Sequence, residues 1–108
     1  MATQNQILEQ LKILERLYHR GEVSEVIEQA LKKIIAHEIT IAQQQTAEIE
    51  TDLKQYETQY QMSSAEFYPK FMAGELGDDI DFVEWSSFYQ MWSSVRERLQ
   101  ILLSNPQA

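Results

Sequence analysis

Four acidic side chains that lie close together in the sequence are the first candidates for chemistry: Asp78, Asp79, Asp81 and Glu84. Carboxylate oxygens suit hard cations such as Ca²⁺, yet the alternating ligands and the glycine of an EF-hand loop are missing here. The same acids suit the N-terminal end of a helix, where they cap free backbone N–H groups and favour the positive end of the helix dipole. We favour this structural role over metal binding, and we expect no metal and no cofactor.

The other residue types that carry catalysis do not form a recognisable site. His19 and His37 are isolated, and the pair His37-Glu38 is not followed by the second histidine of a zinc-protease helix. The sequence contains no cysteine, no glycine-rich phosphate loop and no nucleophile elbow of a serine hydrolase. Its serines have no base partner that can be identified from the sequence. We therefore predict that the protein is not an enzyme.

The net charge of −8 is concentrated in the middle of the chain. Residues 1–37 carry five acidic and five basic side chains, whereas residues 38–84 carry eleven acidic and two basic ones, a net charge of −9. Such a segment repels nucleic acid, whose binders need basic patches. It attracts a basic protein and speeds their encounter. Solubility alone is the simpler explanation of the charge, and both interpretations stay open.

Apolar spacing and the scarcity of Gly and Pro predict an all-α fold in a single domain, residues 1–108. Gly21 can end the first helix in the left-handed conformation. Ser24 and Ser63 are suitable N-caps for the second and third helices, and Asp81 for the fourth. The predicted helices cover residues 5–19, 24–61, 63–73 and 81–104.

Two apolar stripes of similar length predict how these helices pack. The stripe from Ile35 to Tyr60 alternates spacings of three and four residues, as in a heptad repeat, and spans about 39 Å. The fourth helix carries a second stripe on about 36 Å of helix. We expect a long antiparallel helical hairpin, coiled-coil-like, with a short connecting helix and an N-terminal helix. The hairpin could close within one chain or between two, and the N-terminal helix could be docked or free. The seam residues are Ile35, Ile39, Ile49, Leu53, Tyr56, Phe88, Trp92 and Leu99.

Aromatic residues are dense between positions 67 and 92. Such rings are usually core, because they bury the most area. A thin hairpin cannot easily bury eight rings on one face, so we expect some of them to contact another chain, where Trp and Tyr are enriched. The eight rings are Phe67, Tyr68, Phe71, Phe82, Trp85, Phe88, Tyr89 and Trp92.

Residues 21–31 resemble the second helix of ribbon-helix-helix DNA-binding proteins. That fold reads the major groove with an N-terminal strand. Here the residues before the first helix are few and uncharged, and they do not alternate as a strand does. A DNA-binding regulator is therefore the least favoured function, and we do not expect nucleic acid as a partner.

A longer string, residues 62–85, resembles a signature of small helical prokaryotic proteins, within a similarity that covers about residues 50–100. Its most specific part is Gly74-Glu75-Leu76-Gly77-Asp78-Asp79, followed by Phe82, Glu84 and Trp85. The signature is typical of antitoxin components of toxin–antitoxin pairs, those beside TumE-type toxins in particular. The resemblance implies a cognate protein toxin as partner, and many such toxins are ribonucleases with a basic RNA site.

From this resemblance we expect an antitoxin-like protein that covers a toxin by direct contact, with acids pairing to Arg or Lys and aromatic side chains as anchors. The alternative is a homo-oligomeric coiled-coil scaffold without a toxin. We also expect a homo-oligomer, with a dimer favoured. We expect the protein in the cytoplasm, because neither a membrane span nor a signal peptide is evident. The predicted partner-binding residues are Phe67, Phe71, Glu75, Leu76, Asp78, Asp79, Asp81, Phe82, Glu84 and Trp85.

Overall fold

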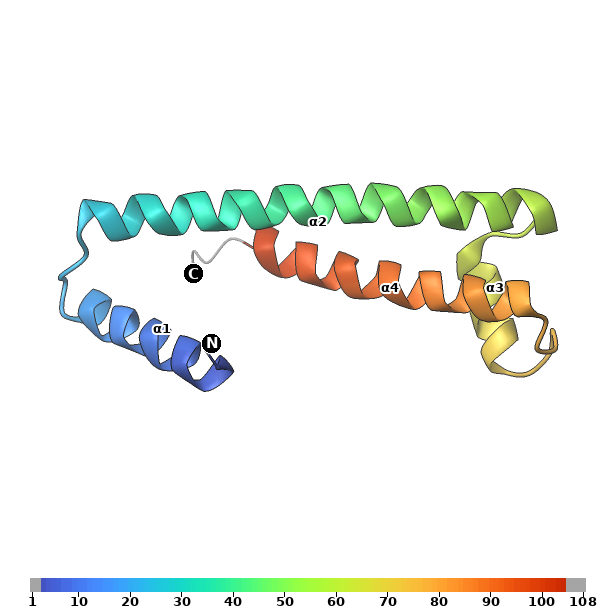
Figure 1. Cartoon of the computed structure of the whole chain (residues 1–108), viewed down its shortest axis with the longest axis horizontal. Coiled ribbons are helices and arrows are strands. Elements are labelled where there is room, and N and C mark those ends of the chain that lie inside the picture. Colours follow the sequence, from blue (N-terminus) through green and yellow to red (C-terminus); the bar gives the residue numbers. More distant parts are fainter. Residues whose placement is uncertain (1–2, 105–108) are drawn as a thin grey trace. The chain divides into compact units, whose positions relative to one another are not determined.

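The computed structural model describes residues 3–104 and is all-helical over that range (Figure 1). Each helix begins and ends within one residue of its predicted bounds. The Asn105-Pro106 pair after the last helix lies outside the described residues. No helix within the described range is long and apolar enough to cross a membrane. The helices are α1 (Gln4–His19), α2 (Glu25–Tyr60), α3 (Ser64–Met72) and α4 (Ile80–Leu103).

Contacts divide the chain into two units, Met1–Ile34 and Ile35–Ala108. The first unit contains α1 and the start of α2. A Schellman turn ends α1, because Gly21 adopts a φ of 81° and the N–H of Glu22 donates to the carbonyl of Leu17 at 2.9 Å. The side chain of Ser24 then caps α2 by accepting from the N–H of Ile27 at 3.2 Å. Both predicted helix boundaries are confirmed.

The second unit contains the predicted antiparallel hairpin, formed by the rest of α2 with α4 and closed at one end by α3 (Figure 1). Side-chain hydrogen bonds join α2 to α4 along its length. The order of these bonds is antiparallel: the residue number of the partner on α2 decreases from 60 to 38, while that of the partner on α4 increases from 81 to 98. The hairpin therefore closes within one chain. The bonded pairs are Tyr60 with Asp81, Tyr56 with Glu84, Glu50 with Trp92, and Glu38 with Arg98.

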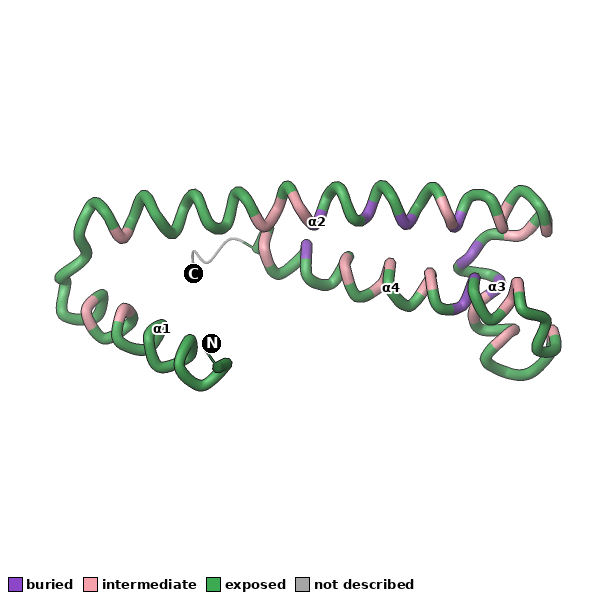
Figure 2. The backbone as a smooth tube through the Cα atoms, in the orientation of Figure 1, coloured by how far each residue is buried: buried purple, intermediate pink, exposed green. Residues whose placement is uncertain are grey.

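The core lies between the three helices of this unit, and Figure 2 shows the buried positions on the facing sides of α2, α3 and α4. Ile49 and Leu53 of α2 meet Phe67 of α3 and Trp85 of α4. The last two are the largest fully buried side chains among the described residues. Rings from α2 and α4 surround them and are half-buried. Most of the aromatic density therefore builds this core.

One local prediction, the N-cap of the fourth helix, needs correction. The N-cap of α4 is Asp79, not Asp81: the Asp79 carboxylate accepts from the N–H of Asp81 at 3.0 Å, and the helix begins at Ile80. Asp81 instead lies in the first turn. In α3, Ser63 caps the helix as predicted, by accepting from the N–H of Glu66 at 3.1 Å. The helix continues through Pro69 to Met72, although Pro69 has no backbone N–H to donate.

Candidate protein-binding surface

Phe67 and Trp85 form the centre of the hairpin's closed end. Both are fully buried, and their rings stack with centroids 3.7 Å apart and planes inclined by 6°. We expected both residues to anchor a partner at the surface, and this expectation does not fit their burial. Each instead contributes the large apolar area that holds α3 against α4. Sequence spacing alone could not separate the two roles, because a helix face that binds α3 has the same pattern as one that binds a partner.

A chain of hydrogen bonds connects all three helices beside these rings. The Trp85 Nε1–H donates to Ser64 Oγ at 2.9 Å, and this bond is buried. The N–H of Ser64 donates in turn to the Glu57 carboxylate at 2.8 Å. Ser64 is 3% exposed, so its hydroxyl has little access to water. These bonds fix the start of α3 against α2 and α4.

Two tyrosines of α2 hold in place two acids of α4 that we predicted to contact a partner. The Tyr56 hydroxyl donates to Glu84 Oε2 at 2.8 Å, and the Tyr60 hydroxyl donates to Asp81 Oδ2 at 2.5 Å. Burial, followed by the bond to Glu84 and nearby carboxylates, raises the pKa of Tyr56 to about 12. The bond to Asp81, followed by burial and nearby carboxylates, raises the pKa of Tyr60 to about 12. Both hydroxyls therefore stay neutral donors at neutral pH.

Residues 38–84 contain six carboxylates with a hydrogen-bond partner, and most of these partners are neutral donors. Of the eleven acids, only Glu38 makes an ion pair among the described residues, with Arg98. Five others accept from tyrosine, tryptophan or backbone donors. A neutral donor orients a carboxylate and leaves its charge in place, so the segment keeps nearly all of its net −9. The five acids are Glu50, Glu57, Asp79, Asp81 and Glu84.

The connector between α3 and α4 presents both acids and apolar side chains. We call residues 72–84 the tip. Glu75, Asp78 and Asp79 are exposed here, and Asp81 is half-buried. Three large apolar side chains of the tip are also exposed. They lie outside the hairpin seam, so apolar spacing in the sequence does not identify them. They are Met72 at 60%, Ile80 at 69% and Val83 at 43% exposure.

The other predicted contact residues divide by burial. Phe71, Leu76 and Phe82 are half-buried and pack against the core cluster, so only part of each ring or side chain reaches the surface. Together with the exposed acids of the tip, they leave a mixed acidic and apolar surface at the closed end of the hairpin. Exposed apolar groups beside charges are typical of protein-binding sites.

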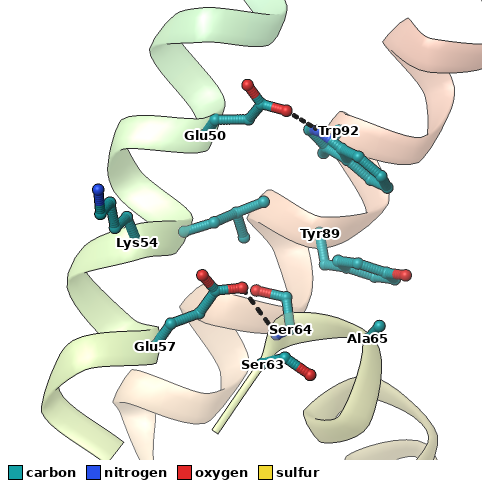
Figure 3. Close-up of a pocket in the computed structure, with 9 residues that line it drawn as sticks. Glu50, Lys54, Glu57, Ser63, Ser64, Ala65, Tyr89 and Trp92 are labelled. Carbon is teal, nitrogen blue, oxygen red and sulfur yellow. Dashed lines mark hydrogen bonds between the residues drawn. The ribbon is translucent and has the colours of Figure 1, made fainter. Parts of the chain in front are cut away.

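An open groove of about 380 Å³ lies on the hairpin (Figure 3). Glu50 and Glu57 of α2 line one side, and Tyr89 and Trp92 of α4 line the other. The Trp92 Nε1–H donates to Glu50 at 3.1 Å. The two rings of α4 stack with centroids 5.5 Å apart. A groove with carboxylates and aromatic faces suits the ammonium or guanidinium group of a basic side chain, and Lys54 also lies on its rim.

The predicted oligomer seam lies mostly inside the hairpin. Ile49, Leu53 and Leu99 are buried, and Ile35 is 47% exposed. The remaining seam residues, Ile39, Tyr56, Phe88 and Trp92, are half-buried. A seam that is covered within one chain cannot also be the main contact between two chains.

The described residues contain no group of three His, Cys, Asp or Glu side chains able to hold a metal ion. Comparisons of the chain with models of protein families, with curated proteins and with solved structures found no match. The antitoxin resemblance of residues 62–85 therefore stays a prediction.

Proposed function

We propose that this chain is a protein-binding component whose tip contacts a basic surface of another protein. The observation that carries the proposal is the way in which the acids of residues 38–84 are held. Their hydrogen-bond donors are almost all neutral, and only Glu38 is paired with a cation among the described residues. A fold that needed these acids only for its own stability would gain more from cationic partners.

The partner that fits such a surface carries Arg or Lys side chains around an apolar patch. Glu75, Asp78 and Asp79 would pair with the cations, and Met72 and Ile80 would fill apolar pockets. Apolar anchors supply most of the affinity in such interfaces, whereas charges set the encounter rate and the choice of partner. Asp81 and Glu84 would contribute charge from positions fixed by the two tyrosines.

A toxin of the kind implied by the resemblance would supply the basic part of such a surface. A ribonuclease must be basic around its RNA site, and an acidic protein bound there competes with RNA for the same cations. We therefore propose antitoxin-like neutralisation by direct contact. A homo-oligomeric scaffold is less favoured, because the predicted seam is already covered within one chain.

Co-expression in bacteria tests this proposal. The open reading frame beside this gene is expressed alone, with the wild-type chain, and with the variant Glu75→Lys/Asp78→Lys, which leaves the helix cap Asp79 in place. We expect the neighbour alone to stop growth, the wild type to restore it, and the variant to fail. Affinity capture of the purified neighbour by each chain measures the same contact directly.

The matched control reverses two exposed acids outside the tip, Glu48 and Glu97. Its change in net charge is identical, so it should still restore growth and bind. Equal loss in both variants would show that net charge alone matters and would contradict a contact at the tip. A harmless neighbour that does not bind the chain would remove the toxin assignment.

A further inference from the structure

The first unit, Met1–Ile34, exposes an apolar surface that nothing within the unit covers. Every buried residue that the structure describes lies between positions 42 and 99, and α1 contains none. Of the sixteen large hydrophobic residues exposed in the described range, nine belong to this unit. Their exposed fractions run from 40% at Leu31 to 78% at Val26.

Both helices of the unit and the turn between them contribute apolar side chains to this surface. Leu11 and Tyr18 of α1, with Val23, Ile27 and Leu31, line an apolar groove of about 250 Å³. Monomeric proteins rarely leave so many large apolar side chains of one short segment in water, and isolated helices of this length are marginally stable. The unit therefore needs a second surface against which to pack.

The charges of this unit indicate what covers it. The unit carries five acidic and five basic side chains, so two copies can meet without the repulsion that the net charge of −9 in residues 38–84 would cause. The start of α2 is also self-complementary: Glu25 and Glu28 precede Lys32 and Lys33. An antiparallel pair of these segments brings the acidic end of each next to the basic end of the other. A parallel pair would oppose like charges instead.

We propose that this face binds a second copy of the chain, with residues 25–34 of the two copies antiparallel and the α1 helices packed against them. The result is a four-helix assembly of two identical helix pairs. The contact uses residues of the first unit and none of the tip. The inference does not rest on the proposed function, and each can fail without the other.

The first experiment measures the mass of the full-length protein in solution by light scattering after gel filtration, between about 5 and 200 μM. We expect twice the chain mass of 12.7 kDa. Leu11→Glu/Leu31→Glu should shift the protein to a monomer, because a carboxylate cannot be buried without a partner. The control Ile101→Glu changes a residue that is 73% exposed on α4 and should stay dimeric.

A charge-swap experiment tests the antiparallel arrangement and leaves the apolar face unchanged. Glu25→Lys/Glu28→Lys makes the segment wholly basic, and Lys32→Glu/Lys33→Glu makes it wholly acidic. Each variant alone should dissociate at a concentration at least tenfold higher than the wild type. Mixed in equal amounts, the two should form a heterodimer, since every pair of opposed charges is then opposite in sign. Circular dichroism checks that both remain helical.

Several results would overturn the inference. A wild-type chain that stays monomeric at 200 μM means that this face is covered in another way. A dimer that survives Leu11→Glu/Leu31→Glu but is lost with Ile101→Glu lies on another surface. Charge variants that do not recover dimers on mixing would contradict the antiparallel pairing.

Discussion

The buried hydrogen bond between Trp85 and Ser64 should be a measurable part of the hairpin's stability. Its donor and acceptor are 2.9 Å apart, and the two residues are 0% and 3% exposed. Domains are stable by about 0.05–0.15 kcal/mol per residue, or about 4–10 kcal/mol for 70 residues. Trp85→Ala would cost about 3–5 kcal/mol and could unfold the protein outright. Trp85→Phe is the better probe, because it keeps a ring stacked on Phe67.

The expected cost of Trp85→Phe has two parts. The smaller ring leaves a void of about 40 Å³, which at about 24 cal/mol per Å³ costs about 1 kcal/mol. The lost donor leaves Ser64 Oγ buried with one hydrogen bond fewer, which costs about 1–2 kcal/mol. Ser64→Ala should cost a similar 1–3 kcal/mol, because it leaves the indole N–H unpaired. In the double variant both polar groups are gone, so it should be about 1–2 kcal/mol more stable than the sum of the single effects predicts.

Urea unfolding of all four proteins, followed by circular dichroism at one fixed protein concentration, measures this coupling. Ser87→Ala is the control, because the Ser87 hydroxyl donates to the carbonyl of Val83 on the exposed side of α4. It should change the free energy of unfolding by less than about 0.5 kcal/mol. If the single effects add to within about 0.5 kcal/mol in the double variant, the bond does not couple α3 to α4 and the reasoning is refuted.

Three further predictions concern the second unit. The pKa values of Tyr56 and Tyr60 rise from 10.0 to about 12 on folding, so their contribution is complete below pH 10 and is lost between pH 10 and 12. Urea midpoints should therefore fall more steeply over this range in the wild type than in Tyr56→Phe/Tyr60→Phe, and equal slopes would contradict the assignment. Gln61 has a φ of 54°, so Gln61→Gly should raise the free energy of unfolding by about 0.5–1 kcal/mol in the same assay. Sodium chloride should raise the melting temperature, because repulsion among the acids weakens as the screening length falls from about 30 Å at 0.01 M salt to about 3 Å at 1 M. A melting temperature that falls with added salt would show that attractive charge pairs dominate.

The helices could be predicted almost completely from local patterns. Gly21, Ser24 and Ser63 mark helix ends through backbone chemistry that depends on neighbours within a few residues, and all three act as predicted. The prediction of Asp81 as the cap of α4 was wrong, because Asp79 caps it. Either aspartate could cap from its local sequence, and the difference depends on Tyr60, which draws Asp81 into a bond across the hairpin.

The residues of the candidate surface could be predicted only in part, for a physical reason. Apolar periodicity shows which face of a helix is buried, and does not show what buries it. Phe67 and Trp85 carry a pattern that fits a partner as well as it fits α3, and only the three-dimensional packing separates these cases. Met72 and Ile80 could not be found in this way either, since single apolar residues beyond a seam are common on protein surfaces.

The hydrogen-bond donors that hold the acids connect the fold with the proposed function. An arginine at position 56 or 60 would also hold Glu84 or Asp81, and would do so more strongly, but it would cancel the charge. A tyrosine hydroxyl fixes the carboxylate at 2.8 Å or 2.5 Å and leaves its charge intact. The same ring adds apolar area to the core, where Tyr56 and Tyr60 both stack on Trp85. One side chain thus stabilises the hairpin and keeps its surface acidic, which is the combination that a protein needs if it must fold alone and then meet a basic partner.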